Sequence, residues 1–479
     1  MIRAGESPRR AVRMTTPQPP VAADSIRVLF LLQRPESWSN VREVCRRMVA
    51  DPRFSASVWV LPYDVRRGAD NAAIVRTSAR LLDAESVEYR IWDESGDFDL
   101  RSHDVVVFTA PYDIERPPSL HFDVVARHVP ITAYVPYGLV VGGGRKNHLL
   151  QYSQPTQAGA TMVFARSWAE KSMYREYCPT GDSHVFVTGL PRLDDACGLG
   201  SNEVDGDLIQ AIGGRFAVLW NSHFSIGSHH RGSLDYSTFD RIAGQLFDYA
   251  AENRDVALIW RPHPHLMPLL VSEGLIAQSQ MDGLRRDLCA AGIVLDERHD
   301  HRHAFAASNA LITDAGSFLI EYLMTGKPMA YLQNPDGPGL TDEASELAGR
   351  LPVARDAAAA IAFIEHTRHQ SPTDWADLGR LRSDFLPMQD GGSARRIVES
   401  IASFAAASRP GSRERLTFSK YPALFRLTES LRDMRHSGDA KSSWFARARG
   451  VYRNLRVEVV ESIKRRPRVL RTLTRMMRR

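Results

Sequence analysis

Histidine and arginine side chains that could hold phosphate or move a proton stand together in the segment WRPHPH (260–265). This segment directly follows VALIW (256–260), an apolar, β-branched run that predicts a buried strand. Guanidinium groups bind phosphate oxygens through paired hydrogen bonds, and imidazole can donate to such oxygens or transfer a proton near neutral pH. Residues just beyond the carboxyl ends of parallel strands form the usual ligand site of an open α/β sheet. We therefore predict that Arg261 and His265 bind substrate and that His263 is catalytic.

A second predicted strand is followed by a glycine-containing turn that leads into a helix. The segment TDAGSF (313–318) follows an apolar run and opens a predicted helix over 317–326. Gly316 permits close approach of the backbone, and the N–H groups of a first helical turn attract anions. Glu321 lies four residues after Ser317 on the same helix face, where its carboxylate can accept hydrogen bonds from ribose hydroxyls. Ordinary helix capping explains this turn equally well, but in one domain with WRPHPH it predicts a nucleotide diphosphate site.

Three further segments place polar residues after predicted strands. His223 lies in WNSHFS and is a second catalytic candidate. Arg145 and Lys146 follow three glycines, which could form a tight or mobile acceptor-side loop, and their charges suit a phosphorylated acceptor. Arg192 lies in TGLPRLD, which is expected to enter the interdomain cleft and bind substrate, although a purely structural turn fits this motif equally well.

These segments need a scaffold that places strand ends side by side. Apolar, β-branched runs alternate with helix-length segments in two consecutive series, which predicts parallel sheets covered on both faces. The fold class is therefore α/β, with two Rossmann-like domains facing a cleft. We predict strands at 26–32, 57–61, 89–92, 104–108, 131–135, 161–165 and 184–189 in the first series, and at 216–220, 256–260, 292–295, 310–313 and 328–332 in the second.

The domain limits follow from the same pattern. Residues 1–24 are rich in proline and arginine without periodicity and are expected to be a disordered leader. The N-terminal acceptor domain is predicted over 25–205. The C-terminal nucleotide-donor domain is predicted over 206–408, and its last helix (393–407) is expected to return and pack on the body. A basic helical tail is predicted over 409–479.

Charge is unevenly distributed along the chain. Residues 441–479 contain 13 Lys and Arg against Glu458 and Glu461, a net +11, so the formal charge of +5 leaves −6 for the other 440 residues. The tail is also amphipathic, a composition typical of helices that lie on anionic lipid. We predict that it binds an anionic membrane surface, although an ordinary packing helix fits the same pattern. Nucleic acid is not an expected partner, because aromatic residues do not alternate with the charges.

Composition restricts the class of protein further. The chain has 479 residues, 43% hydrophobic and 24% charged, which excludes collagen-like and wholly disordered proteins. No apolar run approaches the ~18–20 residues of a membrane span, and the N-terminus lacks the apolar core of a secretory signal. Four scattered cysteines show no metal-ligand spacing, so reduced thiols are expected. These features predict a cytoplasmic protein that is peripheral on the inner face of the cell membrane.

The motifs TGLPRLD, WNSHFS, WRPHP and LITDAGSFLIEYLMTGKPM together resemble, in order and spacing, the CDP-glycerol glycerophosphotransferase family of teichoic-acid and capsule polymerases and primases. The resemblance implies a GT-B architecture. It also implies transfer of glycerol phosphate from CDP-glycerol to a hydroxyl of a membrane-associated, polyprenol-linked acceptor in cell-wall polymer synthesis. In this family pattern, Arg261 and His263 would hold or polarise the donor diphosphate. Ser317 would bind phosphate, and Asp314 and Glu321 would line the nucleotide pocket.

In one place the sequence departs from the family pattern. Teichoic-acid polymerases carry a Trp-His-Gly turn in the acceptor domain, whose histidine is a candidate base. The corresponding segment here reads VPYG (135–138). The general base is therefore expected among His223, His263 and Tyr137.

The predicted reaction is attack of an acceptor hydroxyl on the β-phosphorus of a CDP-linked donor, with CMP as the leaving group. Positioning and electrostatic stabilisation dominate such transfers. No DxD motif or carboxylate cluster is evident at the predicted site, so neither a bound metal nor another cofactor is expected. Two other functions fit the same sequence. One is a nucleotide-sugar glycosyltransferase or epimerase of this architecture, and the other is a non-catalytic, membrane-docked nucleotide-binding protein.

Overall fold

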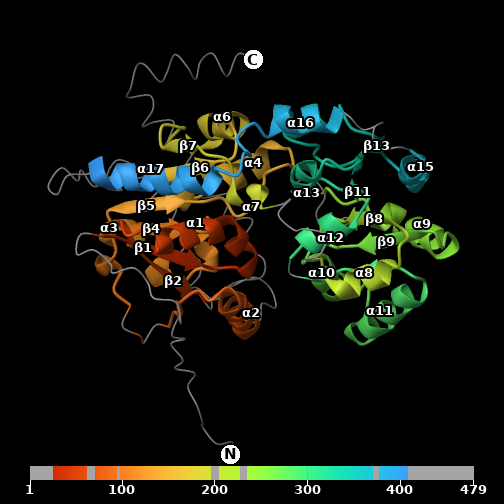
Figure 1. The fold of residues 1–479 in the computed structure, drawn as a ribbon, viewed down its shortest axis with the longest axis horizontal. Helices are drawn as coiled ribbons and strands as arrows, with labels where there is room; N and C mark the ends of the chain where they lie inside the picture. The colour runs from red at the N-terminus through yellow and green to blue at the C-terminus, as the bar shows by residue number, and fades with distance from the viewer. Residues whose placement is uncertain are drawn as a thin grey trace, which may run out of the picture.

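A computed structural model shows two parallel β-sheets, one for each predicted series of strands (Figure 1). It describes residues 25–61, 71–93, 96, 98–195, 204–226, 235–298, 300–370 and 377–407. Within these residues the first sheet has the strand order β3-β2-β1-β4-β5-β6-β7, and the second has the order β10-β9-β8-β11-β12-β13. The neighbouring strands run parallel in both sheets. The predicted α/β class with two Rossmann-like sheets is confirmed.

The strands lie where the apolar runs predict them, apart from shifts at their ends. The first sheet comprises β1 (Ile26–Leu32), β2 (Phe54–Val60), β3 (Tyr89–Ile91), β4 (Val105–Phe108), β5 (Ile131–Tyr134), β6 (Met162–Ala165) and β7 (Val185–Val187). The second comprises β8 (Phe216–Asn221), β9 (Val256–Trp260), β10 (Val294–Leu295), β11 (Ala310–Thr313), β12 (Met329–Leu332) and β13 (Val353–Ala354). Only β13 was not predicted, because two residues after a proline carry no periodic signal.

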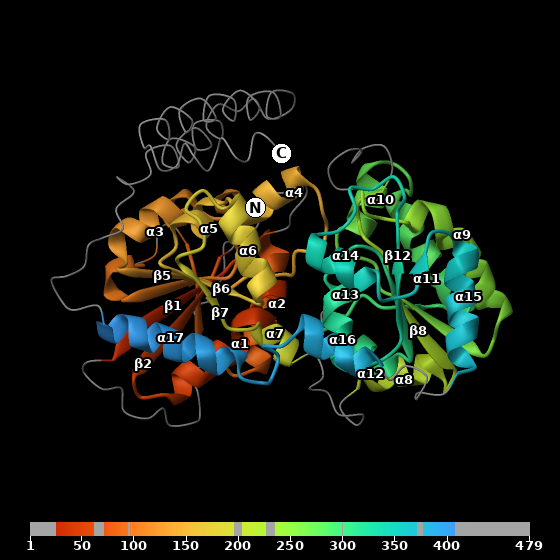
Figure 2. The ribbon, with the colours of Figure 1, turned by 90° about the horizontal axis from the view of Figure 1, so that it is seen from above.

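The first strand shows why these runs are apolar without interruption. Val28 and Phe30 belong to one apolar cluster, and Leu29 and Leu31 belong to another, all with fully buried side chains. Successive side chains of a strand point to opposite faces, so both faces of this sheet are covered. Figure 2 shows helices packed around both sheets.

The helices connect the strands in the manner of β-α-β units. Those of the first half are α1 (Trp38–Ala50), α2 (Asn71–Ala84), α3 (Phe122–His128), α4 (Arg145–Tyr152), α5 (Pro155–Gly159), α6 (Trp168–Tyr177) and α7 (Pro191–Asp194). Those of the second half are α8 (Gly206–Ile212), α9 (Phe239–Glu252), α10 (Leu266–Ser272), α11 (Met281–Ala290), α12 (Arg302–Ala307), α13 (Phe318–Glu321), α14 (Asp342–Ala348), α15 (Ala357–Arg368), α16 (Asp377–Phe385) and α17 (Ser393–Ala407). In the part of the chain that the structure describes, no helix is long and apolar enough to cross a bilayer.

One predicted helix is divided in the structure. The segment expected to be helical over 317–326 forms α13 and then a 3-10 turn, η8 (Tyr322–Thr325). Gly326 follows in the left-handed conformation, with φ of 65°, and ends the helical segment. The first turn of α13 therefore belongs to a much shorter α-helix than predicted.

The last helix leaves the second sheet and packs on the first. α17 lies against α1, as Figure 2 shows. Asp194, at the end of α7, accepts hydrogen bonds from the backbone N–H groups of Gly391 (3.2 Å) and Ser393 (2.8 Å). Glu399 of α17 pairs with Arg53 beside β2 at 2.6 Å. The final helix of segment 206–408 is thus part of the first half's packing.

The glycines at 142–144 form a backbone crossing between the two halves. Gly142 and Leu340 form an antiparallel bridge, and the N–H of Gly143 donates to the carbonyl of Gly339 at 2.9 Å. A Cβ atom on Gly143 would lie 2.4 Å from the carbonyl oxygen of Leu340. Gly143 is therefore needed for close contact between the two backbones. The expected tight or mobile acceptor-side loop stays a prediction, and the structure adds this contact with the second half.

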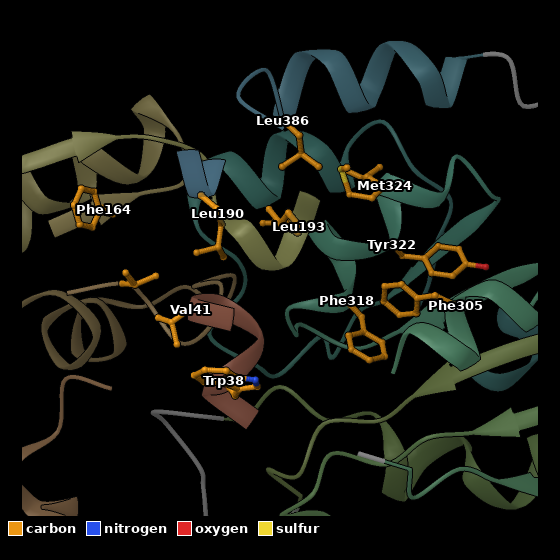
Figure 3. Packing of buried hydrophobic residues seen from close by; sticks show 14 of the residues in the cluster. Trp38, Val41, Phe164, Leu190, Leu193, Phe305, Phe318, Tyr322, Met324 and Leu386 are labelled. Carbon is orange, nitrogen blue, oxygen red and sulfur yellow. The ribbon is translucent and has the colours of Figure 1, made fainter. Parts of the chain in front are cut away.

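An apolar cluster joins the halves on another side (Figure 3). Leu190 and Leu193, at α7, belong to the same cluster as Phe318 of α13 and Leu386 after α16. All four side chains are buried. Burial of a leucine or phenylalanine side chain stabilises a fold by about 1.5–3 kcal/mol, so this cluster holds the two halves together.

Candidate active site

Three predicted histidines gather at the carboxyl ends of β8 and β9, which are neighbours in the second sheet. His223 follows β8, and His263 and His265 follow β9. The ring centroids of His223 and His263 lie 5.5 Å apart, and those of His263 and His265 lie 5.2 Å apart. Phe224 packs between them, 4.7 Å from the His263 ring. The structure therefore brings these three side chains into one group, the histidine cluster.

Backbone hydrogen bonds orient His263. Its own N–H donates to the carbonyl of Ser222 at 2.9 Å, and its Nδ1 accepts from the N–H of His265 at 3.1 Å. In the neutral ring the proton is then on Nε2. His263 consequently presents a hydrogen-bond donor, which suits a phosphate oxygen.

Ser225 orients the ring of His223. The Ser225 hydroxyl lies 2.7 Å from Nδ1 of His223, and its backbone N–H lies 3.2 Å from the same atom. The hydroxyl also accepts a hydrogen bond from the N–H of Tyr236 at 3.0 Å. Fixed by these contacts at Nδ1, the half-buried ring presents its other nitrogen, Nε2, away from Ser225.

Asp314 closes the loop that carries His223. Its carboxylate accepts from the N–H of His223 (2.7 Å), the Ser237 hydroxyl (3.3 Å), and both the N–H (3.2 Å) and the hydroxyl (2.6 Å) of Thr238. Burial raises the pKa of Asp314 to about 7, although these four donors act to lower it. The side chain is only 1% exposed. Asp314 was expected to line the nucleotide pocket, but its carboxylate is fully occupied by this loop.

Glu321 joins the two halves of the molecule through charge. Its Oε2 lies 2.9 Å from Nε of Arg192 in α7 and 3.0 Å from Nε2 of His301. Burial acts to raise the pKa of Glu321, but Arg192 and His301 lower it to about 2. Among the described residues, no partner makes a hydrogen bond of ordinary geometry with the buried Oε1. Two predicted substrate-binding residues thus form one ion pair, with a carboxylate oxygen left to accept.

Arg261 is held by an acidic partner. Its Nη1 donates to Oδ2 of Asp296 at 2.6 Å, and its Nη2 donates to the carbonyl of Arg298 at 2.7 Å. Asp296 is buried and also accepts from Nη1 of Arg298 at 3.0 Å. The guanidinium of Arg261 therefore has a fixed orientation, two residues before His263 in the same loop. Its contact with phosphate stays a prediction.

Gly316 and Ser317 stand between β11 and α13. A Cβ atom on Gly316 would come no closer than 3.6 Å to another atom, the side-chain oxygen of Asn221. The protein itself therefore does not require glycine there. Backbone N–H groups of Leu319 and Ile320 donate to Gly316 and Ser317, as in a helical first turn.

The remaining predicted residues belong to the first half. Arg145 is exposed at the start of α4, and Lys146 follows it in the same helix. Tyr137 is half-buried after β5, with its hydroxyl 3.1 Å from that of Tyr112. Among the residues that the structure describes, no group of three or more His, Cys, Asp or Glu is arranged to hold a metal ion.

Sequence analysis missed several residues that position this site. His301 and Asp296, which hold Glu321 and Arg261, both lie in the charged segment LDERHDHRH (295–303) that follows β10. Arg34 follows β1 in the same way. The rule used for the other segments, polar residues directly after a predicted strand, applies to Asp296 and Arg34 and would have found them, whereas His301 lies six residues beyond its strand.

A sequence model of the family CDP-Glycerol:Poly(glycerophosphate) glycerophosphotransferase matches residues 156–403, which is 248 of the 479 residues. The chain belongs to this family. The matched region contains the histidine cluster, Arg192 and Glu321, and begins after Tyr137. This member of the glycerophosphotransferase family is a transferase, and CDP-glycerol is the donor that the family name specifies. A search among curated proteins gave no match.

Solved structures with the same architecture include enzymes of two kinds. A UDP-N-acetylglucosamine 2-epimerase superposes with a TM-score of 0.55 at 15% identity, over 81% of this chain and 98% of that chain. The S. aureus MnaA–UDP complex gives 0.52 at 14% identity, over 80% and 99%. A variant of the wall teichoic acid polymerase TagF with CDPG gives 0.51 at 10% identity, over 81% and 91%. These likenesses establish a GT-B fold for this glycerophosphotransferase relative.

Proposed function

We propose that this enzyme transfers glycerol phosphate, or a similar polyol phosphate, from a CDP-linked donor to a hydroxyl of a membrane-associated, polyprenol-linked acceptor. The observation that carries the proposal is that the histidine cluster, Arg261 and Glu321 follow the adjacent strands β8, β9 and β11 in a chain of this family. The imidazole N–H donors and the guanidinium of Arg261 match the diphosphate oxygens of a nucleoside diphosphate ester. The buried carboxylate of Glu321 matches its ribose hydroxyls. The polymer made would belong to the cell wall or capsule.

The donor has a distinct partner for each of its parts. Oε1 of Glu321 makes no hydrogen bond of ordinary geometry with the described residues, although the Ser317 side chain helps to lower the pKa of this carboxyl. It accepts a hydrogen bond from a ribose hydroxyl, because a buried carboxylate oxygen without a donor is costly. Ser317 and the N–H groups at the start of α13 meet a phosphate. Arg261 and His265 contact the remaining diphosphate oxygens. Arg192 keeps Glu321 ionised, since it lowers the pKa of that carboxyl.

The chemical step needs one proton acceptor and one stabilising donor. The acceptor hydroxyl attacks the β-phosphorus, forming a new O–P bond, and the bond from that phosphorus to the bridging oxygen breaks, releasing CMP. We assign the proton to an oxygen of the transferred phosphate, because Nδ1 of His223 accepts from the N–H of Ser225 at 3.2 Å and its neutral ring therefore carries a proton on Nε2, where it donates to the donor phosphate. His263 donates from Nε2 to the transferred phosphoryl group, where negative charge is concentrated.

The test is CMP release by the full-length purified protein. CDP-glycerol and CDP-ribitol are each mixed with a lipid-linked acceptor analogue, and CMP and the extended acceptor are measured together. We expect CMP to appear in equal amount with the product for one of the two donors. Stabilisation by UDP-sugars, with turnover of these and not of the CDP-linked donors, would identify a nucleotide-sugar glycosyltransferase or epimerase. Nucleotide binding without any turnover would identify a non-catalytic protein.

The proposed setting is the inner face of the cell membrane. The segment 441–479, with its net charge of +11, lies outside the described residues, so sequence composition alone supports this part. An anionic lipid surface attracts such a segment by about 1 kcal/mol per basic residue near the surface. The enzyme would then meet its lipid-linked acceptor by diffusion in two dimensions.

A further inference from the structure

Arg34, Tyr112 and Tyr137 belong to the first sheet, whereas the histidine cluster belongs to the second, and they lie at the ends of three adjacent strands. Arg34 follows β1, Tyr112 follows β4 and Tyr137 follows β5, and these strands pair in the order β1-β4-β5. Their carboxyl ends meet at one edge of the first sheet because the strands are parallel. Each of the three side chains is partly exposed at this edge, where open α/β sheets bind ligands.

The three side chains are packed against one another. The guanidinium carbon of Arg34 lies 5.6 Å from the ring centre of Tyr112 and 5.2 Å from that of Tyr137. The two tyrosine rings meet edge to face, with centroids 5.8 Å apart. Such cation–π and aromatic contacts hold a group of side chains in one arrangement before a ligand arrives.

The charge of Arg34 is already compensated. Its Nε donates to Oε2 of Glu115 at 2.8 Å, and its Nη2 contacts Oε1 of the same carboxylate. The side chains of Arg34 and Glu115 are 15% and 7% exposed. A phosphate here would compete with Glu115 for the guanidinium and would stand beside a largely buried carboxylate. The group therefore favours an uncharged ligand.

The hydroxyl protons of the tyrosines have a defined direction. The amide oxygen of Gln151 can only accept, so Tyr112 donates its proton to that oxygen at 3.3 Å. Tyr137 then donates its own proton to the Tyr112 hydroxyl at 3.1 Å. The lone pairs of the Tyr137 hydroxyl are left to accept, and Nη1 of Arg34 donates to no residue that the structure describes.

This order of donors also bears on the choice of general base. Burial raises the pKa of Tyr112 well above its ordinary value, and the neighbouring Tyr137 raises it further. Tyr112 therefore keeps its proton at neutral pH and cannot accept one passed along from Tyr137. The hydroxyl of Tyr137 is suited to hold a ligand hydroxyl and not to deprotonate it.

We propose that Arg34, Tyr112 and Tyr137 form an acceptor subsite for an uncharged polyhydroxyl unit, a sugar or polyol, one of whose hydroxyls donates to Tyr137. The proposal deepens the proposed function and rests on it for the role of acceptor. Tyr137 lies four residues before Val141, whose carbonyl accepts from Thr341 at the crossing to the second half. Along the chain, the subsite is thus four residues from a hydrogen bond that joins the two halves.

The test measures ligand binding without donor. Full-length protein is titrated with two pairs of probes that differ by one phosphate, followed by saturation-transfer NMR. The pairs are methyl N-acetylglucosaminide with N-acetylglucosamine 6-phosphate, and glycerol with glycerol 3-phosphate. We expect the uncharged member of at least one pair to bind more tightly than its phosphorylated partner.

Three variants assign the binding to these side chains. Tyr137→Phe keeps the ring and removes the accepting oxygen, and should weaken the uncharged probes by about five- to tenfold, the equivalent of one hydrogen bond. Tyr89→Phe, on β3, removes a hydroxyl that donates to Asp83 of α2 and should leave binding unchanged. Glu115→Gln removes the compensating charge and should shift the preference toward the phosphorylated probes.

Several results would overturn the proposal: tighter binding of both phosphorylated probes to the wild-type protein, no binding of any probe, or unchanged affinity in Tyr137→Phe. If Glu115→Gln does not fold, Tyr137→Phe still decides. Because no donor is present, a protein that fails to release CMP from CDP-glycerol can still give the expected result. Conversely, turnover with unaltered probe binding in Tyr137→Phe would leave the proposed function standing and remove only this subsite.

Discussion

At the scale of single residues, the hydrogen bonds of His263 determine which of its two ring nitrogens can donate to a ligand. Its Nδ1 is occupied by the N–H of His265, so its neutral ring donates from Nε2. His265 contributes that N–H through its backbone, and its side chain is exposed. The two histidines therefore differ in what their side chains can do, although they stand two positions apart.

This difference predicts unequal effects of substitution. His263→Asn should lower kcat/KM for CDP-glycerol by about 100- to 1000-fold, the usual effect of removing a donor to a charged transition state. His265→Ala, in the same loop, should lower it less than about tenfold, since its backbone N–H remains. The measurement is the rate of CMP release by each variant. The melting temperatures of both variants serve as a control for folding. Equal losses in the two variants would contradict the assignment.

Glu321 gives a prediction about pH. Its folded pKa of about 2 is below the ordinary 4.5, so its contribution to stability is present above about pH 4.5 and is lost as the pH falls through about 2. Glu321→Gln should remove about 3 kcal/mol of stability at neutral pH and weaken CDP-glycerol binding. Urea unfolding at pH 7 and pH 3 measures the first effect, and it should be smaller at pH 3. A loss of the same size at both pH values would exclude this ion pair as the cause.

The ion pair between Glu321 and Arg192 could not be predicted from the sequence. Both residues were predicted as substrate-binding residues because they follow strand ends. The 129 positions between them carry no sign that they meet. Tertiary packing brings α7 against α13 through Leu193 and Phe318, and only that packing makes an ion pair of two separate predictions.

At the scale of elements, Asp314 connects β11 to both ends of the loop between β8 and α9. The loop leaves β8 at His223 and returns at Ser237 and Thr238, and one carboxylate holds both ends. Its folded pKa of about 7 exceeds the ordinary 3.8, so the folded state holds a proton that the unfolded state releases. The contribution of this group to stability therefore falls as the pH rises from about 4 to about 7.

Asp314→Asn tests this clasp. The amide nitrogen of the asparagine would face hydrogen-bond donors, so the variant should be less stable than the wild type. Because His223 would be displaced, the variant should also have a lower kcat, with a smaller change in KM. The advantage of the wild type in urea unfolding should shrink as the pH rises from about 4 to about 7. An advantage that grows with pH would show that the carboxylate titrates in the opposite sense. Unchanged kcat would show that His223 does not depend on this anchor.

The glycine crossing predicts a contrast between two nearby positions. Gly143→Ala places a Cβ atom 2.4 Å from the carbonyl of Leu340 and should cost about 1–3 kcal/mol of stability. Gly138→Ala has no atom within 4 Å of the added carbon and should change stability by less than about 0.5 kcal/mol. Thermal unfolding of the two variants makes the comparison. Similar losses would mean that the crossing does not constrain the fold.

Element boundaries were predictable where periodicity was strong. β1 and β9 begin and end at the predicted residues, because each is a continuous apolar run. The predicted helix over 317–326 was divided instead, because its apolar residues are buried on all sides and carry no helical stripe to define its length. The role of the glycines at 142–144 was not predictable, since the backbone they approach comes from residues 339–340.

At the scale of the whole molecule, the basic tail should determine where the enzyme works. Removal of residues 441–479 takes away 13 basic residues and two acidic ones. The shortened protein should no longer sediment with vesicles containing phosphatidylglycerol, and should bind CDP-glycerol as before. Binding of both proteins to neutral phosphatidylcholine vesicles serves as the control. Undiminished sedimentation of the shortened protein would place membrane contact elsewhere in the chain.

The return of α17 to the first half has a consequence for how the polypeptide can be divided. A chain cut between Asp195 and Asp205 would give two fragments, and the larger would still carry α17, whose Ser393 and Glu399 pair with Asp194 and Arg53 of the smaller. The fragments would therefore stay associated as a non-covalent complex after cleavage. Such a cut offers a means of reconstituting the enzyme from separately labelled pieces, so that spectroscopic signals from either half can be observed alone.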